Sequence, residues 1–288
     1  MYDFLIAPFV EFSFMRRALA GVIALSVGGA PVGVFLMLQR MSLTGDAMAH
    51  AILPGAALGF LFFGLQLVPM TIGGIVAGLV VAVAAGVVAR LTPLKEDASL
   101  AAFYLVSLAA GVMIVSLRGS SVDLMHVLFG TVLALDDPTL YLLAIIATIS
   151  ILAVAILWRA LVLDTVDPGF LRSVSGIGAP AHLIFLALVV LNLVAGFHAL
   201  GTLLAVGLMM LPAIAARFWT VEVGRLCLLA MAIGIGSGLA GLLLSYNMSV
   251  PSSPAIILVA GAVYLVSVIA GPRGGLLATY YPGRHREN

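Results

Sequence analysis

The stretch from Met70 to Ala89 reads MTIGGIVAGLVVAVAAGVVA and contains no charged side chain. At the 1.5 Å rise per residue of an α-helix, about 20 apolar residues span the hydrocarbon core of a bilayer. The whole chain shares this character: 63% of its 288 residues are apolar, 9% are charged, and the mean hydropathy is +1.26. Soluble domains carry about 25% charged residues. The composition excludes a soluble enzyme and predicts an all-α, polytopic membrane protein.

Charged residues separate the chain into further apolar runs, which predict the membrane spans. The runs are Ala18–Leu38, Asp46–Gly64, Met70–Ala89, Ala98–Leu117, the shorter Val122–Leu135, Thr139–Trp158, Ala181–Ala199, Gly201–Trp219, Leu226–Tyr246 and Pro254–Ala270. We expect eight or nine transmembrane helices in a single domain over residues 1–288, with at least one broken or half-helix. The basic tail predicts a cytoplasmic C-terminus, with Asp164–Pro180 on the same side and Asp136-Asp137 outside. Nine full crossings would put Arg16-Arg17 outside, against the positive-inside rule, which is why we expect one run to be a broken or half-helix; the choice between eight and nine stays open.

Bulk counts exclude several classes of function. The net charge of +1 provides no basic surface for nucleic acid. Cys227 is the only cysteine, which excludes an internal disulfide and a thiolate metal cage. Lys95, the only lysine, does not lie in a G-x-x-x-x-G-K-[ST] motif, so the chain has no phosphate-binding loop of that kind. We therefore expect a transport protein that has no ATPase motif of its own and binds no permanent cofactor.

The most informative stretch is MSLTGDAMAHAILPG, from Met41 to Gly55. Asp46 and His50 are four residues apart, so on a helix they share a face within roughly 6 Å. Ionisable groups inside a bilayer cost about 3 kcal/mol or more and normally line a bundle interior or a wet cavity. A carboxylate and an imidazole together suit Zn, Mn or Fe ions. Two ligands leave a site open, so a second copy of the chain or water has to complete it.

An alternative interpretation of the pair is purely structural. Asp46 could lie in the first turn of a helix, where a carboxylate favours the helix dipole, while His50 hydrogen-bonds a backbone carbonyl. Pro54 argues against this alternative because a proline in the middle of a span predicts a kink, and kinks can place ligands at a cavity.

The other histidines carry weaker signals. Asp123 and His126 are three residues apart and could share a face, although Asp123 could equally cap a short helix. His182 and His198 lie near the two ends of one span and are expected at the interface or in hydrogen bonds to packing partners.

A polar interval over Asp164–Pro180 interrupts the apolar runs. Asp167 followed by Pro168 is typical of a helix N-cap and first position, and Gly176 can end the helix. The short helix between them would expose Phe170, Leu171 and Val174. An exposed apolar face on a loop helix needs a partner, which could be the lipid headgroup layer or another protein.

With these residues in hand, the chain resembles the membrane permease subunits of bacterial ABC importers for zinc, manganese and iron. The similarity covers most of the length and rests on four blocks in order: Arg40–Gly55 with its G-D-x-x-x-H-x-x-x-P-G pattern, Asp123–Gly130, Gly201–Pro212, and Gly241–Tyr246 continuing through Pro251–Leu258. Ser253 departs from the glycine that family members often carry, and we expect the difference to affect a loop turn.

The resemblance implies an inner-membrane homodimer with cytoplasmic ATP-binding subunits and a metal-binding protein outside. It maps the family's acidic and histidine pair onto Asp46 and His50, and less firmly a second pair onto Asp123 and His126. It also makes Asp167–Ser175 a coupling helix that docks into the ATPase, with contacts from Asp167, Phe170, Leu171 and Arg172.

Three other functions fit the same residues. A secondary transporter could use Asp46 and His50 as proton sites, a structural membrane subunit would tolerate their replacement, and a gated channel would pass metal without ATP. Co-purification of an ATPase subunit distinguishes the ABC permease from the secondary transporter.

Overall fold

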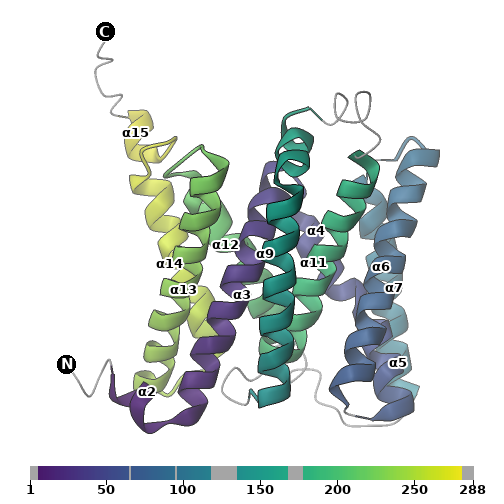
Figure 1. The fold of residues 1–288 in the computed structure, drawn as a ribbon, viewed down its shortest axis with the longest axis horizontal. Helices are drawn as coiled ribbons and strands as arrows, with labels where there is room; N and C mark the ends of the chain where they lie inside the picture. The colour runs from purple at the N-terminus through teal and green to yellow at the C-terminus, as the bar shows by residue number, and fades with distance from the viewer. Residues whose placement is uncertain (1–5, 65, 95, 118–134, 168–177, 281–288) are drawn as a thin grey trace.

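The computed structural model describes residues 6–64, 66–94, 96–117, 135–167 and 178–280. In this part of the chain the structure is an all-helical bundle (Figure 1). Its helices are α2 (Ala7–Glu11), α3 (Ser13–Leu38), α4 (Ser42–Ala51), α5 (Leu53–Phe63), α6 (Leu67–Leu91), α7 (Glu96–Leu117), α9 (Asp137–Val166), α11 (Gly178–Leu200), α12 (Thr202–Arg217), α13 (Val223–Met248), α14 (Ser252–Ala270) and α15 (Leu276–Tyr280).

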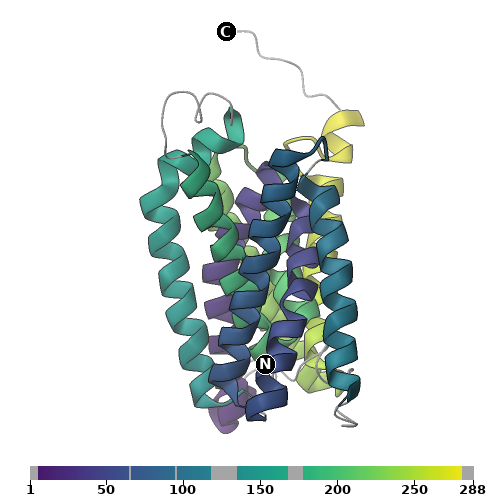
Figure 2. The same cartoon turned by 90° about the vertical axis from the view of Figure 1, so that its right-hand side faces the viewer.

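Seven segments of the described chain are long and apolar enough to cross a membrane, and two shorter apolar helices, Ala98–Ile114 and Thr202–Arg217, accompany them. These nine match the upper end of the predicted count. Figures 1 and 2 show the long helices running roughly side by side between two ends of the bundle. The end of α9, the start of α11 and the C-terminal α15 share one end, which we name the loop end. Helix α2 and the start of α9 lie at the other end (Figure 1).

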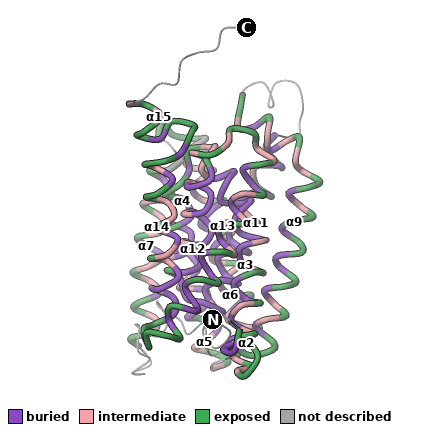
Figure 3. Tube along the Cα trace, turned by 90° about the vertical axis from the view of Figure 1, so that its left-hand side faces the viewer, coloured by how far each residue is buried: buried purple, intermediate pink, exposed green. Residues whose placement is uncertain are grey.

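The core of the bundle forms around α3 and α11, the two most enclosed helices, while α6, α9 and α14 leave most of their apolar surface outward (Figure 3). Polar bonds supplement this packing. Asn192 of α11 is buried and donates from its amide to the Ser150 hydroxyl of α9 at 2.6 Å. In lipid the hydrophobic effect does not favour the association of helices, so such hydrogen bonds and close backbone contacts hold the helices together.

Close backbone contacts occur at the small residues. A Cβ atom at Gly241 of α13 would lie 2.5 Å from the Ile256 Cα of α14, and one at Gly59 of α5 would lie 2.7 Å from the Pro69 carbonyl of α6. Neither position leaves room for a larger side chain. Small residues at such positions let two helices approach closely, as is typical of membrane bundles.

Near the predicted kink at Pro54, the helix is interrupted at Ile52. Helix α4 ends at Ala51 and α5 begins at Leu53, and together they form one candidate span. Pro54 has no N–H to donate to the carbonyl four residues earlier, so the α4 ladder cannot continue through it. The break gives the bundle its predicted broken helix.

Two predicted boundaries are wrong. Helix α9 continues past Trp158 to Val166, because a helix does not have to stop where its apolar run stops. Helix α9 therefore includes the first residues of the Asp164–Pro180 interval, and Asp167, predicted as a helix N-cap, is the C-cap residue of α9. Ser253 lies in the first turn of α14 rather than in a loop, and its hydroxyl donates to the Leu200 carbonyl at 3.3 Å.

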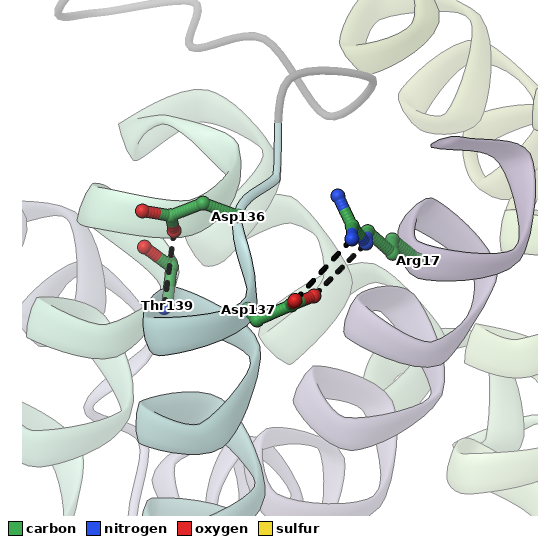
Figure 4. A network of polar contacts seen from close by, with 4 residues as sticks. All are labelled: Arg17, Asp136, Asp137 and Thr139. Atoms are coloured by element: carbon green, nitrogen blue, oxygen red, sulfur yellow. Dashed lines mark hydrogen bonds and ion pairs between the residues drawn. The ribbon is translucent and has the colours of Figure 1, made fainter. Parts of the chain in front are cut away.

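One ion pair lies at the end opposite the loop end (Figure 4). The Arg17 guanidinium of α3 lies 2.9 Å from the Asp137 carboxylate of α9, and Asp136 accepts a hydrogen bond from the Thr139 N–H at 3.1 Å. Arg17 therefore lies at the same end as Asp137, as an odd number of spans requires. The Asp137 carboxylate thereby compensates for the positive charge of Arg17 at this end of the bundle.

Candidate functional site

Helix α4 positions the predicted pair one turn into the bundle. The helix starts at Ser42, so Asp46 belongs to its second turn, and no acidic residue lies in the first turn. The interpretation of Asp46 as a helix-start residue is therefore wrong. His50 occupies the last turn, just before the break. Counted along the helix axis, His50 lies roughly 12 Å from Ser42, well inside the candidate span Ser42–Phe63.

The two side chains face each other. The Asp46 Oδ1 and His50 Nε2 atoms are 3.9 Å apart, which is too long for a hydrogen bond but a separation that two ligands of one ion can have. The Asp46 side chain is 64% exposed and that of His50 is 26% exposed. The His50 Nδ1 atom is buried and has no hydrogen-bond partner among the described residues. Its imidazole is thus not held by a backbone carbonyl there, contrary to the structural alternative.

Helix α7 supports the imidazole and the break. The Tyr104 ring stacks on the His50 ring with centroids 6.1 Å apart and planes inclined by 30°. The buried Ser107 hydroxyl donates to the Ala51 carbonyl, the last residue of α4, at 2.9 Å. This bond satisfies a carbonyl at the point where the helix ends, and the stacking restricts the orientation of the His50 ring.

Asp46 and His50 open into a pocket of about 420 Å³. The other walls come from α12 and α14: Thr202, Leu203, Val206, Gly207, Leu211 and Ile257. Along α12 the lining runs from Leu211 to Thr202, which is roughly 14 Å of helix. Helix α12 ends at Arg217, and the Phe218 carbonyl just after it accepts from the Arg273 N–H, which follows the C-terminal end of α14. The C-terminal end of α12 therefore lies at the loop end. Toward Thr202, at the start of α12, the pocket lining runs away from the loop end. From the pair, the pocket therefore extends toward the end of the bundle where α9 begins (Figure 1).

Sequence reasoning did not find the pocket partners. Thr202, Val206 and Ile257 are apolar or weakly polar residues without a ligand signature, and only their positions in the third and fourth family-like blocks pointed to them. Tyr104 and Ser107 had no signal in the sequence.

Several predicted site residues fall outside the described part of the chain. These are Asp123 and His126 of the second pair, and Phe170, Leu171 and Arg172 of the coupling helix. Asp167 is described and is exposed beyond the end of α9. His198 is predicted to lie at the interface or in a hydrogen bond to a packing partner. Its Nδ1 lies 2.9 Å from the Val194 carbonyl of its own helix, which is a structural role.

A second polar cluster, which we name the clasp, lies at the loop end. It consists of Gln39, Asp164 and His182, from the ends of α3, α9 and α11. The Gln39 amide donates to Asp164 Oδ2 at 3.1 Å, and His182 Nδ1 lies 3.7 Å from the same oxygen. Asp164 is buried, so its carboxylate depends on these partners. No sequence pattern indicates the clasp, because its members are far apart along the chain.

The family model described as the ABC 3 transport family matches residues 11–271. The chain belongs to the ABC 3 transport family. It is therefore a permease, the multi-pass membrane subunit of a bacterial ABC transporter. Family membership also decides against the secondary transporter, the structural subunit and the gated channel.

Relatives of this ABC 3 permease align over nearly the whole chain. It is 30% identical over 263 residues to the manganese import system permease protein ScaB of Streptococcus gordonii, covering 91% of this chain and 93% of the relative. It is 28% identical over 288 residues to the chelated iron transport system membrane protein YfeC of Yersinia pestis, covering 99% and 95%.

A solved structure agrees with the fold. The structure described as PsaBC from Streptococcus pneumoniae in complex with Fab superposes with a TM-score of 0.85 at 28% identity. The match covers 97% of this chain and 100% of the other. The fold of this chain is thus that of a solved protein over nearly its whole length.

Proposed function

We propose that this permease imports a divalent transition metal, manganese or iron before zinc, by alternating access between two copies of the chain. The observation that carries the proposal is the Asp46–His50 pair at the inner end of the α12-lined pocket. The names of the manganese and iron relatives support the choice of cargo.

The chemistry of the pair suits a travelling ion. A carboxylate oxygen and an imidazole nitrogen replace part of the hydration shell of Mn²⁺, Fe²⁺ or Zn²⁺. Two protein ligands bind more weakly than a closed four-ligand site, and a transport site has to release its ion. The Tyr104 ring against His50 limits the reorganisation needed when the ion arrives.

Exposure of Asp46 supports the second copy. A carboxylate that is 64% exposed at membrane depth cannot face lipid without a large penalty. A twofold-related copy packed over α4, α12 and α14 would enclose the pocket and bring a second Asp46 and His50 to it. The ligand set would then be two carboxylates and two imidazoles.

Cross-linking tests this dimer. In a Cys227→Ser background, Leu203→Cys places one thiol at the pocket rim, and a short bis-maleimide should join two copies through it. Ile156→Cys is the matched control, because α9 and α4 lie on opposite faces of the bundle (Figures 1 and 3). Cross-links at position 156 with none at position 203 would contradict the proposed interface.

The ATP-binding partner would act at the loop end. The interval from Asp164 to Pro180 contains the predicted coupling helix, and the clasp joins both of its flanks to Gln39. Gln39 is followed after two residues by Ser42, the start of α4. We infer that movement of the coupling helix reaches Asp46 and His50 through this connection. An extracytoplasmic metal-binding protein would deliver the ion at the opposite end, where the pocket points.

Transport by the whole complex is the test of this function. Vesicles containing the permease and its ATP-binding subunits should transport Mn²⁺ or Fe²⁺ only under two conditions. ATP has to be on the side of the membrane that carries the ATP-binding subunits, and the delivery protein has to be on the other side. Equal metal flux with and without ATP would contradict the proposal, as would uptake by the permease alone.

A further inference from the structure

A second concavity, of about 730 Å³, lies between α9 and α13. Its lining includes Ile156, Trp158 and Arg159 on α9, and Glu222, Arg225 and Leu228 at the start of α13. We name it the α9–α13 groove. It does not share residues with the Asp46–His50 pocket, and α9 lies on the opposite face of the bundle from α4 (Figures 1 and 3).

The groove contains the polar boundary of two neighbouring spans. The apolar run of α9 ends at Trp158 and is followed by Arg159, while the apolar run of α13 begins directly after Arg225. Residues from both boundaries line this one groove, so the two boundaries lie at a similar depth. The end of α9 and the start of α13 lie toward the loop end (Figure 1). Tryptophan and arginine at the end of an apolar run are typical of the headgroup level of a bilayer.

The charges of the groove favour an anion. The Arg225 guanidinium lies 2.9 Å from the Glu222 carboxylate, so these two charges compensate each other. Arg159 is exposed and has no ion pair with another described residue. The groove therefore carries one uncompensated positive charge beside a second guanidinium, and guanidinium groups bind phosphate through paired hydrogen bonds.

Toward the hydrocarbon the groove is apolar. Ile156 is 81% exposed and Leu228 is 65% exposed, one on each wall. A cationic rim at headgroup level above an apolar wall matches a molecule with an anionic head and an acyl chain. A second copy of the chain does not fit this description, because the proposed dimer uses the other face.

We propose that the α9–α13 groove binds an anionic phospholipid, with Arg159 and Arg225 on its phosphate and an acyl chain along Ile156 and Leu228. The lipid fills the space between two helices at the loop end. Neutral lipid, which lacks net negative charge, should bind there more weakly.

Native mass spectrometry of the purified complex, with phosphatidylglycerol or phosphatidylcholine added, tests the site. The complex should retain phosphatidylglycerol preferentially, and added phosphatidylglycerol should raise its Tm more than phosphatidylcholine does. At about 1 kcal/mol per basic residue near anionic lipid, Arg159→Gln with Arg225→Gln should weaken phosphatidylglycerol binding about 30-fold. The pair Arg217→Gln and Arg273→Gln removes two exposed arginines outside the groove and should leave binding unchanged.

A second variant guards against misfolding. Ile156→Trp keeps both arginines and fills the apolar wall, so it should also displace phosphatidylglycerol while the Tm in phosphatidylcholine stays at the wild-type value. Equal retention of the two lipids, or equal loss in the control pair, would overturn the proposal. The proposal would also be overturned if the groove residues were shielded from solvent only when the ATP-binding subunit is bound, because the groove would then be a protein interface.

Discussion

Asp46→Ala and His50→Ala should each reduce ATP-driven metal uptake to the level of vesicles without permease, while the dimer still assembles. Each variant removes one of two ligands from the pocket, and the remaining group alone cannot replace the lost hydration of a divalent ion. Neither side chain holds the fold in place: Asp46 is exposed, and His50 has an unpaired buried nitrogen among the described residues. Size-exclusion chromatography and uptake of Mn²⁺ by the reconstituted complex measure the two outcomes separately.

Leu43→Ala provides the matched control for this pair. Leu43 lies on the same helix, is largely exposed and does not line the pocket. It should leave uptake within about twofold of wild type, as surface substitutions away from a site generally do. Wild-type uptake by both Asp46→Ala and His50→Ala would remove the pair from the transport path.

Asp164→Leu should uncouple ATP hydrolysis from transport. The substitution removes the acceptor shared by the Gln39 amide and the neighbouring His182 ring. Loss of a buried acceptor leaves its donors without a hydrogen bond, which costs about 1–3 kcal/mol of stability. It also removes the link between the end of α3 and the two helices that flank the Asp164–Pro180 interval. We expect the metal carried per ATP hydrolysed to fall about tenfold, although Asp46 and His50 are unchanged.

Asp164→Asn separates a coupling role from a general loss of stability. The amide keeps an oxygen that accepts from Gln39, so it should restore much of the transport-to-hydrolysis ratio. Asp136→Asn, at the other end of α9, is the control and should leave that ratio unchanged. A proportional fall of uptake and hydrolysis in Asp164→Leu would mean that the clasp only stabilises the fold.

The fold was largely predictable because bilayer spans are encoded locally. Twenty apolar residues without charge, as in Met70–Ala89, leave a helix as the only way to satisfy the backbone in lipid. Helix ends were less predictable: α9 extends to Val166, eight residues past its apolar run, because outside the hydrocarbon a helix can continue through polar residues. The break near Pro54 was readable from one residue, since proline cannot donate the required hydrogen bond.

The functional pair was predictable for the same local reason, and its surroundings were not. Four-residue spacing alone places Asp46 beside His50. Tyr104 contacts His50 and Thr202 lines the pocket only through the packing of α7 and α12, and residue types of this kind occur throughout the chain. Gln39 and Asp164 are 125 residues apart, so their contact follows from tertiary structure and has no sequence signature.

Pulsed electron paramagnetic resonance of Mn²⁺ trapped in the complex tests the central claim most directly. If Asp46 and His50 ligate the ion, the spectrum contains a nitrogen coupling from a directly bound imidazole, and His50→Gln abolishes that coupling. Asp46→Ala should weaken Mn²⁺ retention in the same preparation. An unchanged nitrogen coupling in His50→Gln, or a spectrum without directly bound nitrogen in the wild-type complex, would contradict the account.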